Sequence, residues 1–183
     1  VTTDEKSIAV LPFVPLSANE DDAYFGKGIA EELLNALTKF PELKVAARTS
    51  AFSFEGQNVD LREIGQRLGV AHVLEGSVRS AGDKVRVTAQ LIRTDDGFHL
   101  WSETYDRNMS DLFVVQDEIV AAINRTLQIR LGVGVGAIRV TGKQVDPGAY
   151  QNYLRGLELW GTRSNPNNRR NAIKTFQQVT AQD

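Results

Sequence analysis

Apolar and polar positions along this chain repeat with two different periods. The unbroken apolar run SIAVLPF at 7–13 ends near a proline, which suits a strand buried on both faces. Residues 17–40 follow with a period of 3.6, which predicts a helix that ends at Pro41. Its apolar stripe consists of Phe25, Ile29, Leu33, Leu37 and Phe40. A second strand is predicted at 43–50, and this strand, helix and strand succession implies parallel pairing.

The next part of the chain predicts a short helix, three strands and a long helix. Asp60 can cap a helix that ends at Gly69. Two strands, at 72–80 and 85–94, are separated by the turn AGDK, and in the second strand apolar residues alternate with polar ones. The turn TDDG returns the chain as an antiparallel partner that begins near Phe98. A helix over 111–131 completes an α/β fold with two layers, a mixed five-stranded sheet and the order β-α-β-α-β-β-β-α.

The remaining residues predict a separate, helical unit. Residues 132–146 are rich in glycine and read as a linker between a domain at 1–131 and the last segment. Residues 147–183 predict two amphipathic helices that form a hairpin around the polar stretch RSNPNN. The chain begins with valine and stops within a polar stretch, so we expect it to be a piece of a longer protein.

Composition excludes several kinds of function. The chain is 42% hydrophobic and 24% charged, and it contains no cysteine, which excludes disulfides and thiolate chemistry. Residues 1–131 carry 14 Lys and Arg against 20 Asp and Glu, and residues 132–183 carry 7 against 3. Because an acidic domain repels phosphates, we expect no contact with nucleic acid. No apolar run is long enough to span a bilayer, so we expect no membrane contact by this segment itself.

The stretch DDGFHLWSETYDR at 95–107 is the densest group of chemically versatile side chains. A regular strand would place His99, Trp101, Glu103 and Tyr105 on one side. His99 and Glu103 would then lie about 13 Å apart, which is too far for direct proton transfer. A face that carries Trp and Tyr more often packs against a helix, so we interpret this strand as a wall of the core.

Other candidate chemistry has an ordinary structural explanation. GVGVG at 132–136 follows a predicted helix, whereas a dinucleotide-binding loop follows a strand and precedes a helix. The two histidines, His72 and His99, lie on different predicted strands, and no carboxylate spacing completes a metal site. Helix capping and a solvated face explain the pairs Asp21/Asp22 and Glu31/Glu32. The sequence thus predicts no catalytic residue, no metal site and no cofactor.

One region could bind a ligand. Small molecules tend to bind beyond the carboxyl ends of parallel strands, which here means Pro12–Ser17 and 48–53. The candidate rim residues are Arg48, Thr49, Ser50 and Ser53. The alternative is an ordinary loop in which Phe52 and Phe54 fill the core.

Several segments resemble, in order and spacing, the TolB N-terminal-like domain of bacterial multidomain signalling proteins. They are SIAVLPF, YFGKGIAEELLNAL, LKVAARTSAFSF, LREIGQRLGVAHVLEGSVR, VRVTAQLI and GFHLWSETYDR. The resemblance covers about residues 5–131. Members are followed by tetratricopeptide repeats, and Gly156, Ala172 and Phe176 fall near that repeat's small and aromatic positions. The turn between the two helices is longer than the repeat's pattern.

The resemblance implies a regulatory domain with no catalytic residues to transfer. Such a domain lies between an output module, for instance a nucleotide cyclase, and a repeat array that binds protein partners. A membrane span often precedes it, which would place it outside the cytoplasm. We therefore expect a non-enzymatic sensory or interaction segment that relays binding to a distant output domain. The alternatives are a receptor domain for a small molecule and the regulatory region of a class III adenylate or guanylate cyclase.

Overall fold

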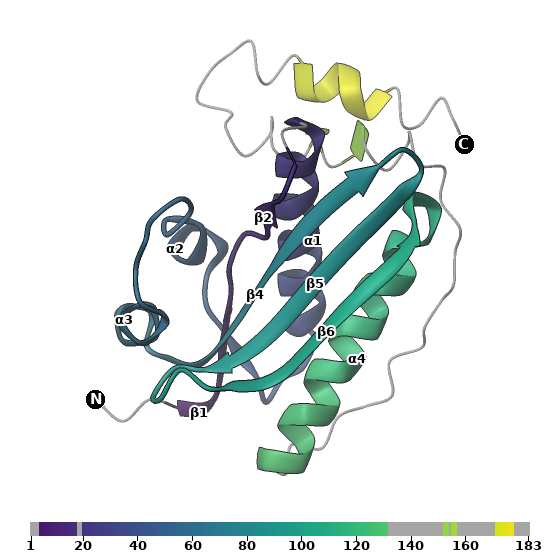
Figure 1. The fold of residues 1–183 in the computed structure, drawn as a ribbon. Helices are drawn as coiled ribbons and strands as arrows, with labels where there is room; N and C mark the ends of the chain where they lie inside the picture. The colour runs from purple at the N-terminus through teal and green to yellow at the C-terminus, as the bar shows by residue number, and fades with distance from the viewer. Residues whose placement is uncertain (1–3, 18–19, 132–151, 154, 157–170, 178–183) are drawn as a thin grey trace.

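A mixed β-sheet forms the centre of the computed structural model, which describes residues 4–17, 20–131, 152–153, 155–156 and 171–177 (Figure 1). The strands are β1 Asp4–Val10, β2 Val14–Pro15, β3 Lys44–Val45, β4 Val70–Ala81, β5 Lys84–Arg93 and β6 His99–Asn108. Their order in space is β3-β1-β4-β5-β6, and the short β2 pairs with β4. Strand β1 pairs in parallel with β3 and β4, and β2 pairs in parallel with β4. Strands β4, β5 and β6 form an antiparallel meander.

The helices cover the two faces of the sheet unequally. They are α1 Glu20–Leu37, α2 Arg48–Phe52, α3 Leu61–Leu68 and α4 Leu112–Leu131, the last preceded by the 3₁₀ turn Met109–Asp111. Helices α1 and α4 lie side by side across one face (Figure 1). The short α2 and α3 pack on the other face beside β1 and β4. Among the described residues, no helix covers the outer face of β5 and β6 (Figure 1).

The larger core lies between the sheet and helices α1 and α4. The α1 stripe is buried as its spacing predicts, since Ile29, Leu33 and Leu37 are each 0% exposed. Alternation in β5 works in the same way, with Val87 and Leu91 buried while Arg86 is exposed. The predicted mixed α/β fold is therefore confirmed.

The structure differs from the predicted elements in two places. The predicted strand 43–50 is reduced to Lys44–Val45, and Arg48–Phe52 forms α2, in which Ala51 is buried beside the second small core. The sheet also has a sixth strand, β2, because the chain pairs with β4 again after Pro12 and Phe13. Two-residue strands are too short for periodicity to reveal.

The strand that carries His99 contains an irregularity that periodicity does not predict. Trp101 lies opposite Leu91, but His99 lies opposite Ile92, so Leu100 is the extra residue of a bulge. The prediction that His99 shares a face with Trp101 is therefore wrong. Trp101 and Tyr105 do pack on the core, while His99 is exposed on the outer face.

Part of the C-terminal segment contacts α1. The hydroxyl of Tyr153 donates to the Glu32 carboxylate at 2.9 Å, and the Arg155 guanidinium lies 5.8 Å from the centre of the Tyr24 ring. Residues 171–177 are helical, and Gly156 packs so closely on the Phe176 ring that a Cβ would lie 2.5 Å from it. The predicted linker at 132–146 and most of the hairpin lie outside the described residues.

Candidate functional site

A groove of about 500 Å³ opens on the face of the sheet that α1 and α4 do not cover. Its floor consists of polar residues of β4 and β5, namely Glu75, Ser77 and Gln90. One wall is the segment Leu11–Pro15, where β1 ends and β2 begins. The other wall comes from the α2–α3 loop and from α3. The residues of that second wall are Phe54, Glu55, Gly56, Gln57, Val59, Leu61 and Ile64.

The break between β1 and β2 creates the groove. Leu11 still donates to Leu74 of β4, but the Phe13 amide turns away and donates to the Gly26 carbonyl of α1 at 3.2 Å. Pairing resumes when Leu16 donates to Val78. The diverted segment leaves Val14 at the edge of the groove, with 57% of its surface exposed.

Two glycines make this path possible. A Cβ on Gly26 would lie 2.1 Å from the Phe13 carbonyl oxygen, and one on Gly76 would lie 2.5 Å from the Phe13 ring. Both distances are far below van der Waals contact, so the backbone of α1 and β4 can approach Phe13 only without a side chain at either position.

Glu75 is the most unusual residue of the groove. Its side chain is half-buried, and burial raises the pKa of its carboxyl group, an effect that the charge of His99 opposes. No hydrogen bond or ion pair joins this carboxylate to another residue in the described part of the chain. The second carboxylate, that of Glu55, pairs with Lys27 at 3.2 Å.

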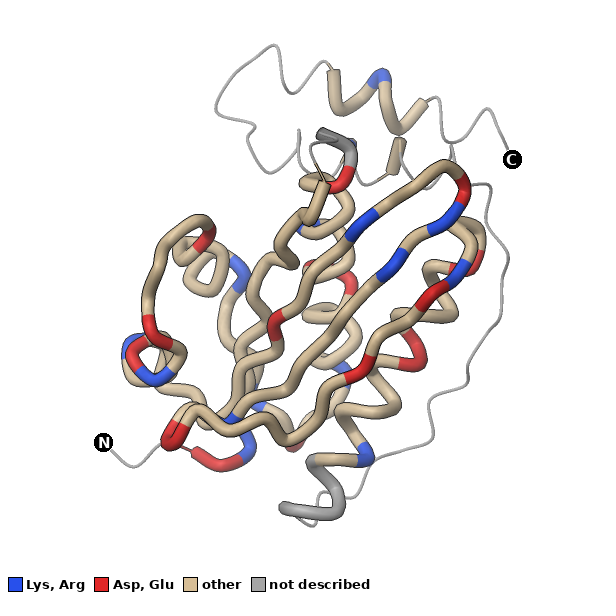
Figure 2. Tube along the Cα trace, viewed as in Figure 1, with Lys and Arg blue, Asp and Glu red and all other residues tan. Residues whose placement is uncertain are grey.

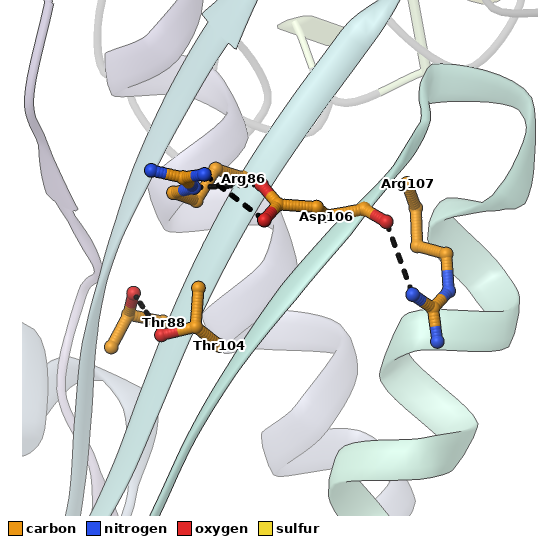
Figure 3. Close-up of polar contacts among 5 residues, drawn as sticks. All are labelled: Arg86, Thr88, Thr104, Asp106 and Arg107. Atoms are coloured by element: carbon orange, nitrogen blue, oxygen red, sulfur yellow. Dashed lines mark hydrogen bonds and ion pairs between the residues drawn. The ribbon is translucent and has the colours of Figure 1, made fainter.

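Cross-strand pairs join β5 and β6 on their outer face (Figure 3). Arg86 donates to both carboxylate oxygens of Asp106, at 2.6 and 3.0 Å, and the hydroxyls of Thr88 and Thr104 lie 3.1 Å apart. Arg86 holds the pKa of the Asp106 carboxyl below its usual value through this hydrogen-bonded pair. These exposed pairs fix β6 to β5 and leave little free charge.

Three of the predicted rim residues, Arg48, Thr49 and Ser50, lie on α2, and Ser53 caps its C-terminus, so none of the four lines the groove. Arg48 forms an ion pair with Glu31 at 3.1 Å and lies 4.5 Å from the centre of the Phe52 ring. Thr49 and Ser50 are exposed, and the Ser53 hydroxyl donates to the Ser50 carbonyl. Ligand binding by these four residues stays a prediction. The other half of the predicted region, which begins at Pro12, does line the groove.

The remaining acidic and histidine candidates are separated by the fold. His72 and His99 point to opposite faces of the sheet, because His99 lies opposite Ile92, which in turn pairs with Val73. His72 is buried, and burial lowers the pKa of its ring. In the described part of the chain, no group of three acidic or histidine side chains is placed to hold a metal ion.

Asp22 has a structural role that the sequence did not reveal. It is 0% exposed, and its carboxylate accepts hydrogen bonds from the Ser80 amide at 3.0 Å and from the hydroxyls of Ser17 and Ser80. The prediction of a solvated or capping role for Asp22 is therefore wrong, because the side chain joins α1 to β4. Glu31 and Glu32 also have specific partners, in Arg48 and Tyr153.

Sequence reasoning missed the groove for a local reason. Glu75 is one carboxylate within HVLEGSV, which reads as an ordinary polar position in a strand. The adjacent glycine was the one available signal, since glycine inside a strand often marks a close approach of backbone or ligand.

Residues 4–133 match the family described as the HilA/YgeH-like transcriptional regulator, second domain. The chain belongs to this family. A relative of this HilA/YgeH-like domain is the putative adenylate cyclase 3 of Rhizobium meliloti (strain 1021), which is 43% identical over 152 residues. The match covers 83% of the present chain and 26% of the cyclase, so the chain spans about a quarter of that relative's length.

Two solved structures were compared with the HilA/YgeH-like domain. Lipoprotein GNA1162 from Neisseria meningitidis has a TM-score of 0.50 at 20% identity, over 70% of this chain and 99% of its own, and so shares the fold. TolB from Acinetobacter baumannii has a TM-score of 0.47 at 16% identity, over 66% of this chain and 28% of its own. No helix of the described residues is long and apolar enough to span a membrane.

Proposed function

We propose that this chain is a non-catalytic regulatory segment of a multidomain bacterial signalling protein. In this proposal the α/β domain relays its binding state to the chain that follows it, and protein partners bind the helical repeats beyond residue 147. The observation that carries the proposal is the contact between α1 and the C-terminal segment, made by Tyr153 and Glu32. Membership in a family of regulator domains supports it.

The physical path of this relay runs through α1. The groove wall is bonded to α1 where Phe13 donates to Gly26, and the C-terminal segment contacts the same helix at Tyr24 and Glu32. A ligand that moves the wall would therefore change the position of a helix on which the C-terminal segment rests. The ligand changes the balance between the two positions of α1 only to the extent that it binds one position more tightly than the other.

The relay can be tested with Tyr153→Phe in this chain, by hydrogen exchange with mass spectrometry. Loss of the hydroxyl removes a hydrogen bond worth about 1 kcal/mol, so exchange in residues 171–177 should quicken about fivefold while exchange in β4 and β5 is unchanged. Tyr105→Phe is a matched control, because Tyr105 also donates to a glutamate, Glu103, at 2.8 Å and away from α1. Equal exchange in 171–177 for Tyr153→Phe and the unchanged chain would contradict the proposal.

The regulatory role leaves catalysis to another part of the protein. The 43% identical relative is named as a putative adenylate cyclase, and this chain corresponds to about a quarter of it. We therefore propose the regulatory region of a nucleotide cyclase as the more specific function. Incubation of this chain with ATP and Mg²⁺ should yield no cyclic AMP by mass spectrometry, and formation of cyclic AMP by the purified chain would overturn the non-catalytic role.

The proposal also places this segment outside the cytoplasm, as the resemblance to the TolB N-terminal-like domain implies. Fusion of alkaline phosphatase to the end of the segment, within the full-length protein, tests this location. The fusion should be active, because that enzyme matures only outside the cytoplasm.

A further inference from the structure

The groove combines an apolar wall with the Glu75 carboxylate, which pairs with no other residue among those that the structure describes. Leu11, Val14, Val59 and Leu61 supply apolar surface, and Glu75 lies on the floor between Ser77 and Gln90. The two charged lining residues are both acidic, and Glu55 is already neutralised by Lys27. The charge still open to a ligand in the groove is therefore the negative charge of Glu75.

We infer that the groove binds a small organic cation, an amine with an apolar body, whose ammonium group pairs with Glu75. This inference rests on the proposed function and deepens it by naming the class of ligand in the groove, whereas the binding test below does not depend on the relay through α1. A groove of about 500 Å³ lies within the size range of small-molecule sites, which are mostly apolar with a few placed polar groups. Ser77 and Gln90 can accept further hydrogen bonds from the ammonium group.

The position of Glu75 explains why a cation is favoured over a neutral or anionic ligand. A half-buried carboxylate without a partner has lost part of its hydration, and an ammonium group restores a charge-assisted hydrogen bond. An anion in the same place would face Glu75 and be repelled. The charge distribution agrees, because three of the four basic residues of β4 and β5, Arg79, Lys84 and Arg86, lie toward the hairpin end, away from the groove (Figure 2). The fourth, Arg93 at the other end of β5, pairs with Asp95 and Asp96.

The basic hairpin end is a weaker candidate for a ligand site. Arg79, Lys84, Arg86 and Arg107 line a depression there, but Asp106 binds Arg86 with both carboxylate oxygens and Glu118 pairs with Arg107. Two of these four basic side chains are therefore already paired within the fold, and Asp111 adds a further negative charge to the lining.

Binding can be measured by titrating the isotope-labelled chain with three amines and following its amide resonances. The probes are 2-phenylethylamine, tryptamine and 3-methylbutylamine, and the neutral and anionic counterparts of the first are 2-phenylethanol and 3-phenylpropanoate. At least one amine should shift the amides of Glu75 and Gln90 with a dissociation constant in the millimolar range or below. The alcohol should bind at least about tenfold more weakly, and the propanoate should not bind.

Two glutamate-to-glutamine substitutions, which keep the side-chain volume but remove the charge, test whether the charge of Glu75 holds the amine. Glu75→Gln keeps the side-chain volume and should weaken amine binding by about tenfold, with little effect on the alcohol. Glu55→Gln changes the other lining carboxylate and should alter binding less than twofold. The inference is overturned if none of the amines shifts these resonances, if the alcohol binds as tightly as its amine, or if Glu75→Gln binds the amine unchanged.

Discussion

At the scale of one residue, Glu75 shows how a side chain in a binding site can lower the stability of the folded protein. Burial raises the pKa of its carboxyl group above the usual value of 4.5, so ionisation is less favourable in the folded chain than in the unfolded chain. The carboxyl therefore contributes most favourably below the unfolded pKa, and stability falls as pH rises through the folded pKa. At neutral pH the ionised Glu75 carboxylate therefore lowers the stability of the folded chain, and a bound cation would offset this loss.

Glu75→Gln should consequently stabilise the free protein at pH 7. The free energy of unfolding, measured by urea denaturation, should exceed that of the unchanged chain at neutral pH. The difference should vanish well below pH 4.5, where Glu75 of the unchanged chain is protonated in both the folded and the unfolded state. His99 and Glu55 are the nearby charged groups to keep unchanged. A less stable Glu75→Gln at pH 7 would mean that the carboxylate is already paired favourably.

Asp22 represents the opposite case, a buried carboxylate whose hydrogen bonds hold the fold together. Asp22→Ala leaves the amide and hydroxyl of Ser80 without their buried acceptor, so the free energy of unfolding should fall by about 3 kcal/mol. Urea denaturation measures this loss. Glu63→Ala, which removes an exposed pair with Arg67 one helical turn away, should cost less than about 0.5 kcal/mol. Similar losses for both variants would show that the buried hydrogen bonds of Asp22 contribute no more to stability than an exposed ion pair does.

At the scale of elements, long periodic segments were predictable because their pattern repeats over several turns. Helix α1 and strand β5 each bury one face, and that face can be read from the chain alone. Helix α2, strand β2 and the bulge at Leu100 were not predictable. Each involves only a few residues, and contacts with distant parts of the chain decide their form, as Ala51 packed beside Leu11 illustrates.

The candidate site divides in the same way. Parallel strands predicted a binding region beyond their carboxyl ends, and the Pro12 segment does line the groove. The floor at Glu75 and the contact between Tyr153 and Glu32 could not be read from the chain. The latter joins residues 121 positions apart, and no local pattern specifies such a partner.

The close contact between Gly26 of α1 and Phe13, between β1 and β2, leads to another prediction. Gly26→Ala would place a Cβ 2.1 Å from the Phe13 carbonyl oxygen, so α1 or the groove wall must move. Because this overpacking involves backbone, we expect a loss of about 2–3 kcal/mol in urea denaturation and displaced amide resonances for Phe13 and Val14. An unchanged stability would show that the wall yields easily.

At the scale of the whole molecule, the groove and the C-terminal segment share one helix. Phe13 connects the groove wall to Gly26, and Glu32, less than two helical turns further on, receives the Tyr153 hydroxyl. Helices transmit small displacements well because their backbone is rigid and their buried face is closely packed. A path of contacts is not yet a coupling, however, and energetic coupling has to be measured as a difference between binding free energies.

Reciprocity supplies that measurement. If an amine in the groove changes the docking of the C-terminal segment by some factor, the loss of docking must change the amine's affinity by the same factor. We expect saturating 2-phenylethylamine to alter exchange in residues 171–177, and Tyr153→Phe to change the dissociation constant of the amine, while Tyr105→Phe leaves it unchanged. Because Tyr153→Phe weakens docking by about 1 kcal/mol, the dissociation constant should change by up to about fivefold. Equal amine affinities in Tyr153→Phe and the unchanged chain would show that the groove is not coupled to the docking of the C-terminal segment. A ligand that binds the docked and the undocked chain equally well cannot move the equilibrium between them.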